Sequence, residues 1–153
     1  MEYIKATEEN IDCVFDVVQT TILKIYPKYY PGEIVDFFCE HHNREMIAKD
    51  IKNGNVGILS DYNRIVGTGS HDGNHITRVY VLPEFQGKGY GGSIMQCLED
   101  EVAMKYGEVL LDASLPASHF YEQRGYCTIR HEKIPVKNDV VLVYEVMEKI
   151  FHH

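Results

Sequence analysis

Four glycines lie within six residues of this chain, between a strand-like run and a helical pattern. The stretch is VYVLPEFQGKGYGGSIMQCLE, Val79 to Glu99, and its clustered glycines are Gly87, Gly89, Gly91 and Gly92. Glycine lets the backbone adopt conformations that side chains forbid, so successive N–H groups can turn toward one point. That point lies at a helix N-terminus, whose dipole also favours an anion. The junction therefore predicts an anion-binding site made of backbone N–H groups.

Two other interpretations of the junction compete with this one. Gly87, Gly89 and Gly92 satisfy the G-x-G-x-x-G pattern of dinucleotide-binding folds, and Asp112 falls near the acidic position of such folds. That pattern should follow its strand at once in a leading parallel βαβ unit, whereas PEFQ intervenes here after a predicted meander. The second alternative is a simple tight turn. Such a turn needs one glycine, and each glycine in ordered structure costs about 0.5–1 kcal/mol of stability, so four glycines exceed what a turn requires. The sequence Gly-x-x-x-x-Gly-Lys-Ser/Thr of a P-loop does not occur.

Apolar periodicity predicts a mixed α/β fold. Helical spacing marks segments 7–25, 31–41, 91–106 and 116–124, with a short further helix at 43–51. β-Rich runs mark segments 3–6, 56–60, 64–72, 75–82, 108–114, 126–132 and 139–147. Turn-type clusters join the runs between 56 and 82, which predicts three antiparallel strands. The order is βααβββαβαββ, in a single domain over residues 1–153.

The predicted helix after the glycines is amphipathic. Met95, Leu98 and Val102 form its apolar side, and Glu99, Asp100 and Lys105 are expected to face water.

Composition narrows the classes of partner. The net charge is −8 and the basic residues are scattered, which excludes the basic stripe typical of a nucleic-acid partner. The four cysteines are far apart in sequence, as expected of reduced thiols in a cytoplasmic protein. The N-terminus MEYIKATEEN lacks the apolar core of a signal peptide, and no run reaches the roughly 20 apolar residues of a membrane span. We expect a cytoplasmic protein with no membrane partner.

Two segments resemble the GCN5-related N-acetyltransferase (GNAT) family. The segment VLPEFQGKGYGG fills every defined position of that family's acetyl-CoA-binding pattern, Val-x-Pro-x-x-Gln/Arg-x-x-Gly-x-Gly/Ala, with Val81, Pro83, Gln86, Gly89 and Gly91. The segment LDASLPASHFYEQRGY, residues 111–126, is similar to the family's later strand and Tyr-bearing helix. The resemblance implies a GNAT-type mixed central sheet with helices on both faces. It also implies N-acetyltransferase activity, with acetyl-CoA as cosubstrate and a small-molecule or peptide amine as acceptor.

The resemblance also assigns cofactor-binding residues. Backbone N–H groups of the glycine segment would hold the pyrophosphate of coenzyme A, and the pantetheine arm would lie where the strand 79–81 splays from the strand 108–114. The residues implied are Val79, Tyr80, Val81, Gln86, Gly87, Lys88, Gly89, Tyr90, Gly91, Gly92, Ser93 and Ser114. Ser114 stands where many relatives have asparagine, and its hydroxyl has less reach. Arg124 and Lys88 are further candidates for the adenosine phosphates.

Tyr121 matches the tyrosine that, in many relatives, protonates the departing thiolate of coenzyme A. A phenol of ordinary pKa about 10 is protonated at neutral pH and can give its proton to a thiolate of pKa about 8.5. The implied reaction is direct transfer in a ternary complex, with the N–H of Val81 polarising the thioester carbonyl. A mechanism through Cys97 and His119 lacks the signature of a catalytic cysteine.

Several questions stay open at the level of sequence. His71, His75 and Glu33 are candidate bases, and Tyr26, Tyr29 and Tyr30 are candidate walls of the acceptor pocket. Polyamines, aminoglycosides, amino acids and protein N-termini remain as acceptors, and a homodimer is left open. No metal is expected, because the adjacent His41 and His42 would not share a helix face. A non-catalytic acyl-CoA-binding module and a dinucleotide-binding protein are the alternative functions.

Overall fold

The computed structural model describes residues 1–152 and confirms a mixed α/β fold. Its strands are β1 (Glu2–Lys5), β2 (Val56–Asp61), β3 (Arg64–Asp72), β4 (His75–Val81), β5 (Glu108–Ala113), β6 (Cys127–Pro135) and β7 (Val141–Ile150). Its α-helices are α1 (Ile11–Ile25), α2 (Gly32–His41), α3 (Arg44–Lys52), α4 (Tyr90–Ala103) and α5 (Ser118–Gln123). The seven strands form one sheet in the order β1-β2-β3-β4-β5-β7-β6. The short helix expected at 43–51 is present as α3.

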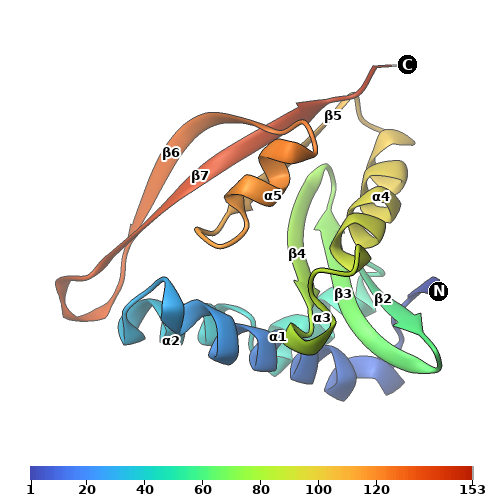
Figure 1. The fold of residues 1–153 in the computed structure, drawn as a ribbon, viewed down its shortest axis with the longest axis horizontal. Coiled ribbons are helices and arrows are strands. Elements are labelled where there is room, and N and C mark those ends of the chain that lie inside the picture. Colours follow the sequence, from blue (N-terminus) through green and yellow to red (C-terminus); the bar gives the residue numbers. More distant parts are fainter. Residues whose placement is uncertain (153) are drawn as a thin grey trace.

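Helices cover both faces of the sheet, and a separate apolar core lies under each layer (Figure 1). Under α4 and α5, Ile94, Met95 and Leu98 pack with Leu111 and Tyr121. Under α1, α2 and α3, the core residues include Val14, Val18, Ile22, Val35, Ile47 and Tyr80. The sheet is thus fixed from both sides, as the family resemblance implies.

The sheet is antiparallel except where β4 meets β5, and there it divides. The parallel pairing covers only His75 with Leu110 and Ile76 with Leu111. Directly afterwards β4 carries a bulge, because Ser70 pairs with Arg78 and His71 with Ile76, which leaves Thr77 as an extra residue. A bulge bends its strand and increases the local twist. Figure 1 shows the result, with β2–β4 diverging from β5–β7.

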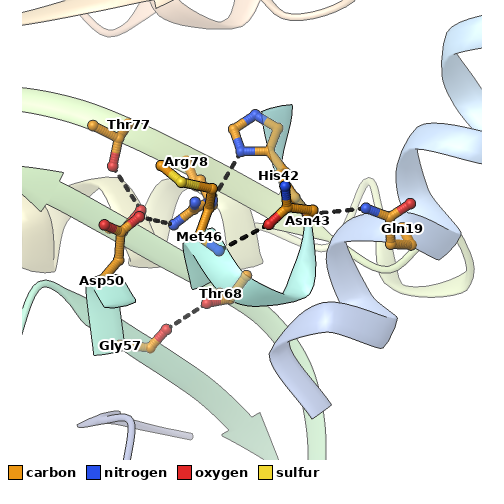
Figure 2. Close-up of polar contacts among 10 residues, drawn as sticks. Gln19, His42, Asn43, Met46, Asp50, Gly57, Thr68, Thr77 and Arg78 are labelled. Carbon is orange, nitrogen blue, oxygen red and sulfur yellow. Dashed lines mark hydrogen bonds and ion pairs between the residues drawn. The ribbon is translucent and has the colours of Figure 1, made fainter. Parts of the chain in front are cut away.

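A buried arginine ties the sheet to the helices α2 and α3. Arg78 of β4 donates from Nε to His42 Nδ1 at 2.9 Å, and its Nη1 lies 2.8 Å from Asp50 Oδ2 (Figure 2). Only 5% of Arg78 is exposed. Gln19 of α1 donates to the carbonyl of His42 at 3.0 Å, so α1 joins the same cluster. Because His42 accepts the bond at Nδ1, its neutral form is the one that fits.

A second buried cluster corrects one sequence expectation. Glu99 was expected to face water, but only 4% of it is exposed. It accepts hydrogen bonds from Arg124 and from the Tyr126 hydroxyl, both at 2.8 Å, and Lys149 Nζ lies 3.4 Å away. Burial and then the neighbouring Glu99 raise the pKa of Tyr126. A buried carboxylate needs such partners, and here they join α4 to the start of β6 and to β7.

The environment of His42 makes the stability of the fold depend on pH. Burial, and then the charge of Arg78, lower the pKa of His42 to about 3. The pKa of this imidazole in the unfolded chain is about 6.5. At a pH below that value, His42 therefore binds a proton in the unfolded chain but not in the folded one. We expect this group to remove about 1 kcal/mol of unfolding free energy per pH unit as pH falls from 6 to 4. His42→Gln, which keeps an acceptor for Arg78, should have a shallower slope.

Urea unfolding at pH 4, 5, 6 and 7 measures that slope. His119→Gln is the matched control, because the side chain of His119 is exposed. Equal slopes for His42→Gln and the wild-type chain would contradict the assignment.

Candidate functional site

A cavity of about 370 Å³ lies where β4 and β5 diverge. It reaches from α2 and the β6–β7 hairpin to α5. Four of the residues that the resemblance implies line this cavity, namely Val79, Tyr80, Ser114 and Tyr121. The other lining residues are Tyr26, Phe37, Phe38, His41, His42, His75, Ile76, Thr77, Arg78, Leu111, Asp112, Ala113, Ala117, Ile134, Leu142 and Tyr144. Strand divergence has thus opened a space that side chains of both sheet halves enclose.

The edge of β4 offers backbone groups to this gap. The carbonyl of Val81 accepts from the side chains of Gln86 at 2.9 Å and Thr21 at 3.4 Å, whereas the next residue, Leu82, donates its N–H to Val66 of β3 at 2.9 Å. In an extended strand the N–H and C=O of one residue point to the same side. The N–H of Val81 therefore faces away from β3, toward the divergence, and so does that of Val79 two residues before it.

The glycine junction follows at the end of β4. Gly87 and Gly89 have φ of +78° and +87°, the left-handed region that glycine adopts without strain, and Gly89 is the N-cap of α4. The N–H of Ser93 bonds to the carbonyl of Gly89 at 3.1 Å. That bond is the first within the helix. The N–H groups of Tyr90, Gly91 and Gly92 belong to the first turn, so the helix offers them no carbonyl acceptor. The junction is therefore a set of N–H donors at the N-terminus of a 14-residue helix.

Side chains hold the junction in place. The Tyr90 hydroxyl donates to Asp61 at 2.7 Å, and Lys88 Nζ lies 5.7 Å from the centre of the Phe85 ring. Arg124 stands beside the first turn of α4, since a Cβ on Gly92 would lie 3.6 Å from Arg124 Nη1. The same arginine pairs with Glu99. The resemblance offered Arg124 and Lys88 as phosphate contacts, and both lie at this end of α4.

Two glycines that sequence reasoning missed let α4 approach the sheet. A Cβ on Gly67 would lie 2.8 Å from Ile94 Cδ1, and one on Gly69 would lie 2.5 Å from Ile94 Cγ2. The spacing of Gly67 and Gly69 in β3 was the available signal, because alternate residues share one face of a strand. Close packing at this point brings the N-terminus of α4 beside the end of β4.

Tyr121 reaches the cavity from α5. It is 7% exposed and packs in the core under α4 and α5. Burial, and then the neighbouring Tyr26, raise the pKa of Tyr121, so its phenol stays protonated at neutral pH. Tyr26 approaches from the opposite side, with its hydroxyl 3.4 Å from that of Tyr80. Burial raises the pKa of Tyr26, and the nearby Ser114 opposes this effect; both residues line the cavity.

The three tyrosines before α2 have different positions. Tyr26 lines the cavity, and the Tyr30 hydroxyl accepts the N–H of Leu115 at 2.7 Å, which fixes the turn after β5. Tyr30 lines a second hollow of about 320 Å³ beside the first, whereas Tyr29 is half exposed. Of the three tyrosines expected to line the acceptor pocket, Tyr26 lines the cavity, Tyr30 lines the second hollow, and Tyr29 lies at the surface.

The candidate bases and nucleophiles are also separated. His75 lines the cavity, with Nε2 3.5 Å from Asp112 Oδ1. His71 instead bonds to Glu101 of α4 at 2.8 Å, and Glu33 is not part of the lining. Burial raises the pKa of the Cys97 thiol, which disfavours a reactive thiolate, and neither Cys97 nor His119 lines the cavity.

Within residues 1–152 no group of three or more His, Cys, Asp or Glu side chains is arranged to hold a metal ion. In the same range, no helix has the length and apolarity needed to cross a bilayer.

Solved structures share this fold over almost the whole chain. One is a GCN5-related N-acetyltransferase from Rhodopseudomonas palustris, 21% identical, with a TM-score of 0.89, covering 98% of this chain and 95% of that one. Another is the PaiA N-acetyltransferase of Thermoplasma acidophilum in complex with coenzyme A, 18% identical, with a TM-score of 0.75, covering 98% of both chains. A third is YncA of Salmonella typhimurium, a putative acetyltransferase with acetyl-CoA, 15% identical, with a TM-score of 0.71, covering 100% and 95%.

A comparison with curated proteins finds no match. The family model described as an acetyltransferase (GNAT) domain matches residues 25–147, which contain the divergent strands, the glycine junction and α5. The chain therefore belongs to the GNAT family of acetyltransferases.

Proposed function

We propose that the protein transfers an acetyl group from acetyl-CoA directly to a primary amine. Three observations carry this proposal: the N–H donors at the start of α4, the gap between β4 and β5, and the phenol of Tyr121 lining the cavity in that gap. A diphosphate, a pantetheine arm and a thioester follow one another in the same order along acetyl-CoA.

The glycine junction would bind the diphosphate. Its donors are the backbone N–H groups of residues 87–93, and the helix dipole adds to their attraction for an anion. The pantetheine amides would pair with β4 at Val79 and Val81, whose backbone groups face the gap, and with Ser114 across from them. Such pairing resembles the addition of a strand to a sheet edge.

The chemistry is a nucleophilic attack by the free amine on the thioester carbon. A C–N bond forms and the C–S bond breaks, while the N–H of Val81 stabilises the developing oxyanion. The thiolate that leaves takes the proton of Tyr121, and the proton that the attacking nitrogen loses as the amide forms passes through water to restore the phenol. His75 is the candidate base that lines the cavity, and it would accept the proton that the ammonium form of the acceptor must lose before attack.

Binding at the junction predicts a stabilisation that is specific for coenzyme A. Acetyl-CoA at 100 times its Kd should add about 2.7 kcal/mol to the unfolding free energy, and NAD at the same concentration should add nothing. Gly89→Ala should weaken this effect, because an alanine at φ +87° costs about 1–2 kcal/mol and shifts the N–H groups around it.

Thermal unfolding with each ligand measures the effect. Gly107→Ala is the matched control, because a Cβ there meets nothing within 4 Å and no positive φ is required. Stabilisation by NAD with none by acetyl-CoA would overturn the proposed function in favour of a dinucleotide-binding protein.

Loss of the Tyr121 hydroxyl predicts a defect in turnover rather than in binding. Tyr121→Phe should lower kcat about 10²-fold or more, the contribution expected of a general acid. Thiol release with a panel of amines measures kcat, and the thermal shift with acetyl-CoA should be preserved. Tyr62→Phe, at an 83% exposed position, is the control.

Full turnover by Tyr121→Phe would show that another group is the acid. Binding of acetyl-CoA without thiol release by any amine would instead indicate a non-catalytic acyl-CoA-binding module.

A further inference from the structure

The cavity continues beyond the gap, toward α2 and the β6–β7 hairpin. Leu111 and Ala113 of β5 pack in the core under α4 and α5, so Asp112 between them points to the other face, where it lines this outer part. His75 of β4 meets it there, at 3.5 Å. About half of the Asp112 side chain is exposed. A carboxylate thus stands in the outer part of the cavity, on the face of β5 opposite the core under α4 and α5.

Asp112 is the one charged group of the lining that no arginine or lysine neutralises within the described part of the chain. Among the Asp, Glu, Lys and Arg residues, only Asp112 and Arg78 line the cavity. The guanidinium of Arg78 is buried, with Nε donating to His42 and Nη1 2.8 Å from Asp50. Burial and then Arg78 lower the pKa of His41, which leaves that ring neutral at pH 7. The chain as a whole carries a net charge of −8.

The walls around Asp112 are aromatic and apolar. The rings of Phe37 and His41 stack with centroids 5.6 Å apart on the α2 side. Tyr144 of β7 closes the opposite side, and burial followed by the charge of Asp112 raises its pKa. Ile134 and Leu142 complete this wall from the β6–β7 hairpin. Aromatic faces attract cations, and apolar walls favour an uncharged body behind the cation.

We propose that this outer part is the acceptor subsite, and that it selects a small monoamine with an apolar or aromatic body and no carboxylate beside the amine. The inference rests on the proposed function, since it names the acceptor of the same site. Asp112 would attract the ammonium group, and the walls formed by Phe37 and Tyr144 would hold the body.

The same charges disfavour two other classes of acceptor. The carboxylate of an amino acid would lie near Asp112, and the lining holds no arginine or lysine to balance it other than the buried Arg78. A polyamine would bring further ammonium groups to a cavity whose lining holds a single carboxylate. The volume of about 370 Å³, which the thioester must share, also favours a small acceptor.

The test uses phenethylamine, L-phenylalanine and spermidine as acceptors at saturating acetyl-CoA, with thiol release as the readout. Phenethylamine should have a kcat/KM at least about tenfold above both others. Asp112→Asn should raise the KM for phenethylamine about fivefold, as expected for a partly exposed ion pair, and should leave the KM for acetyl-CoA unchanged. Asp112→Glu, which keeps the charge, should restore most of the affinity. Asp16→Asn removes a charge from an exposed position on α1 and should change neither constant.

Equal or better use of L-phenylalanine or spermidine would overturn the inference, and so would an unchanged phenethylamine KM in Asp112→Asn. Calorimetric titration of phenethylamine into the complex with coenzyme A separates this inference from the proposed function. Binding that Asp112→Asn weakens, with no turnover, would support the subsite and refute the transferase. Absence of binding to the wild-type complex would refute the subsite.

Discussion

The bulge at Thr77 is the constraint on which the rest of the site depends. It ends the pairing of β4 with β5 after two residue pairs and leaves backbone donors and acceptors unpaired in the middle of a sheet. Buried backbone groups need partners, and here Gln86 and Thr21 satisfy the Val81 carbonyl from their side chains. The N–H groups on the same edge face the gap, where we propose that the pantetheine arm binds. A defect in the sheet thus becomes a surface that can bind an extended chain with amide groups.

Two polar clusters fix the elements that surround the gap. Arg78 ties β4 to α2 and α3 directly after the bulge, and Glu99 ties α4 to Arg124, Tyr126 and Lys149. Each cluster stands beside a part of the site, since Arg78 lines the cavity and Arg124 lies beside the first turn of α4. Removing one partner would leave a buried charge unpaired, which typically costs several kcal/mol. The geometry of the site and the stability of the fold therefore share the same residues.

Local patterns in the sequence predict most of the elements and the glycine junction, because periodicity, turn residues and glycines act over short distances. The surroundings of Glu99 were mispredicted for the same reason. Its place on α4 suggests exposure, but its partners come from positions 124, 126 and 149, and only the folded chain brings them together. The width of the gap also escaped prediction, since it depends on which residue of β4 is left unpaired opposite β3. Asp112 was noted only as part of a dinucleotide pattern, and its place in the cavity follows from strand alternation on β5.

A structure of the protein crystallised with coenzyme A tests the central claim most directly. It should show diphosphate oxygens about 3 Å from backbone nitrogens of the glycine junction, with the pantetheine arm lying between β4 and β5 and its sulfur beside the Tyr121 hydroxyl. A diphosphate bound elsewhere, or strands β4 and β5 paired along their whole length around an empty junction, would contradict the account.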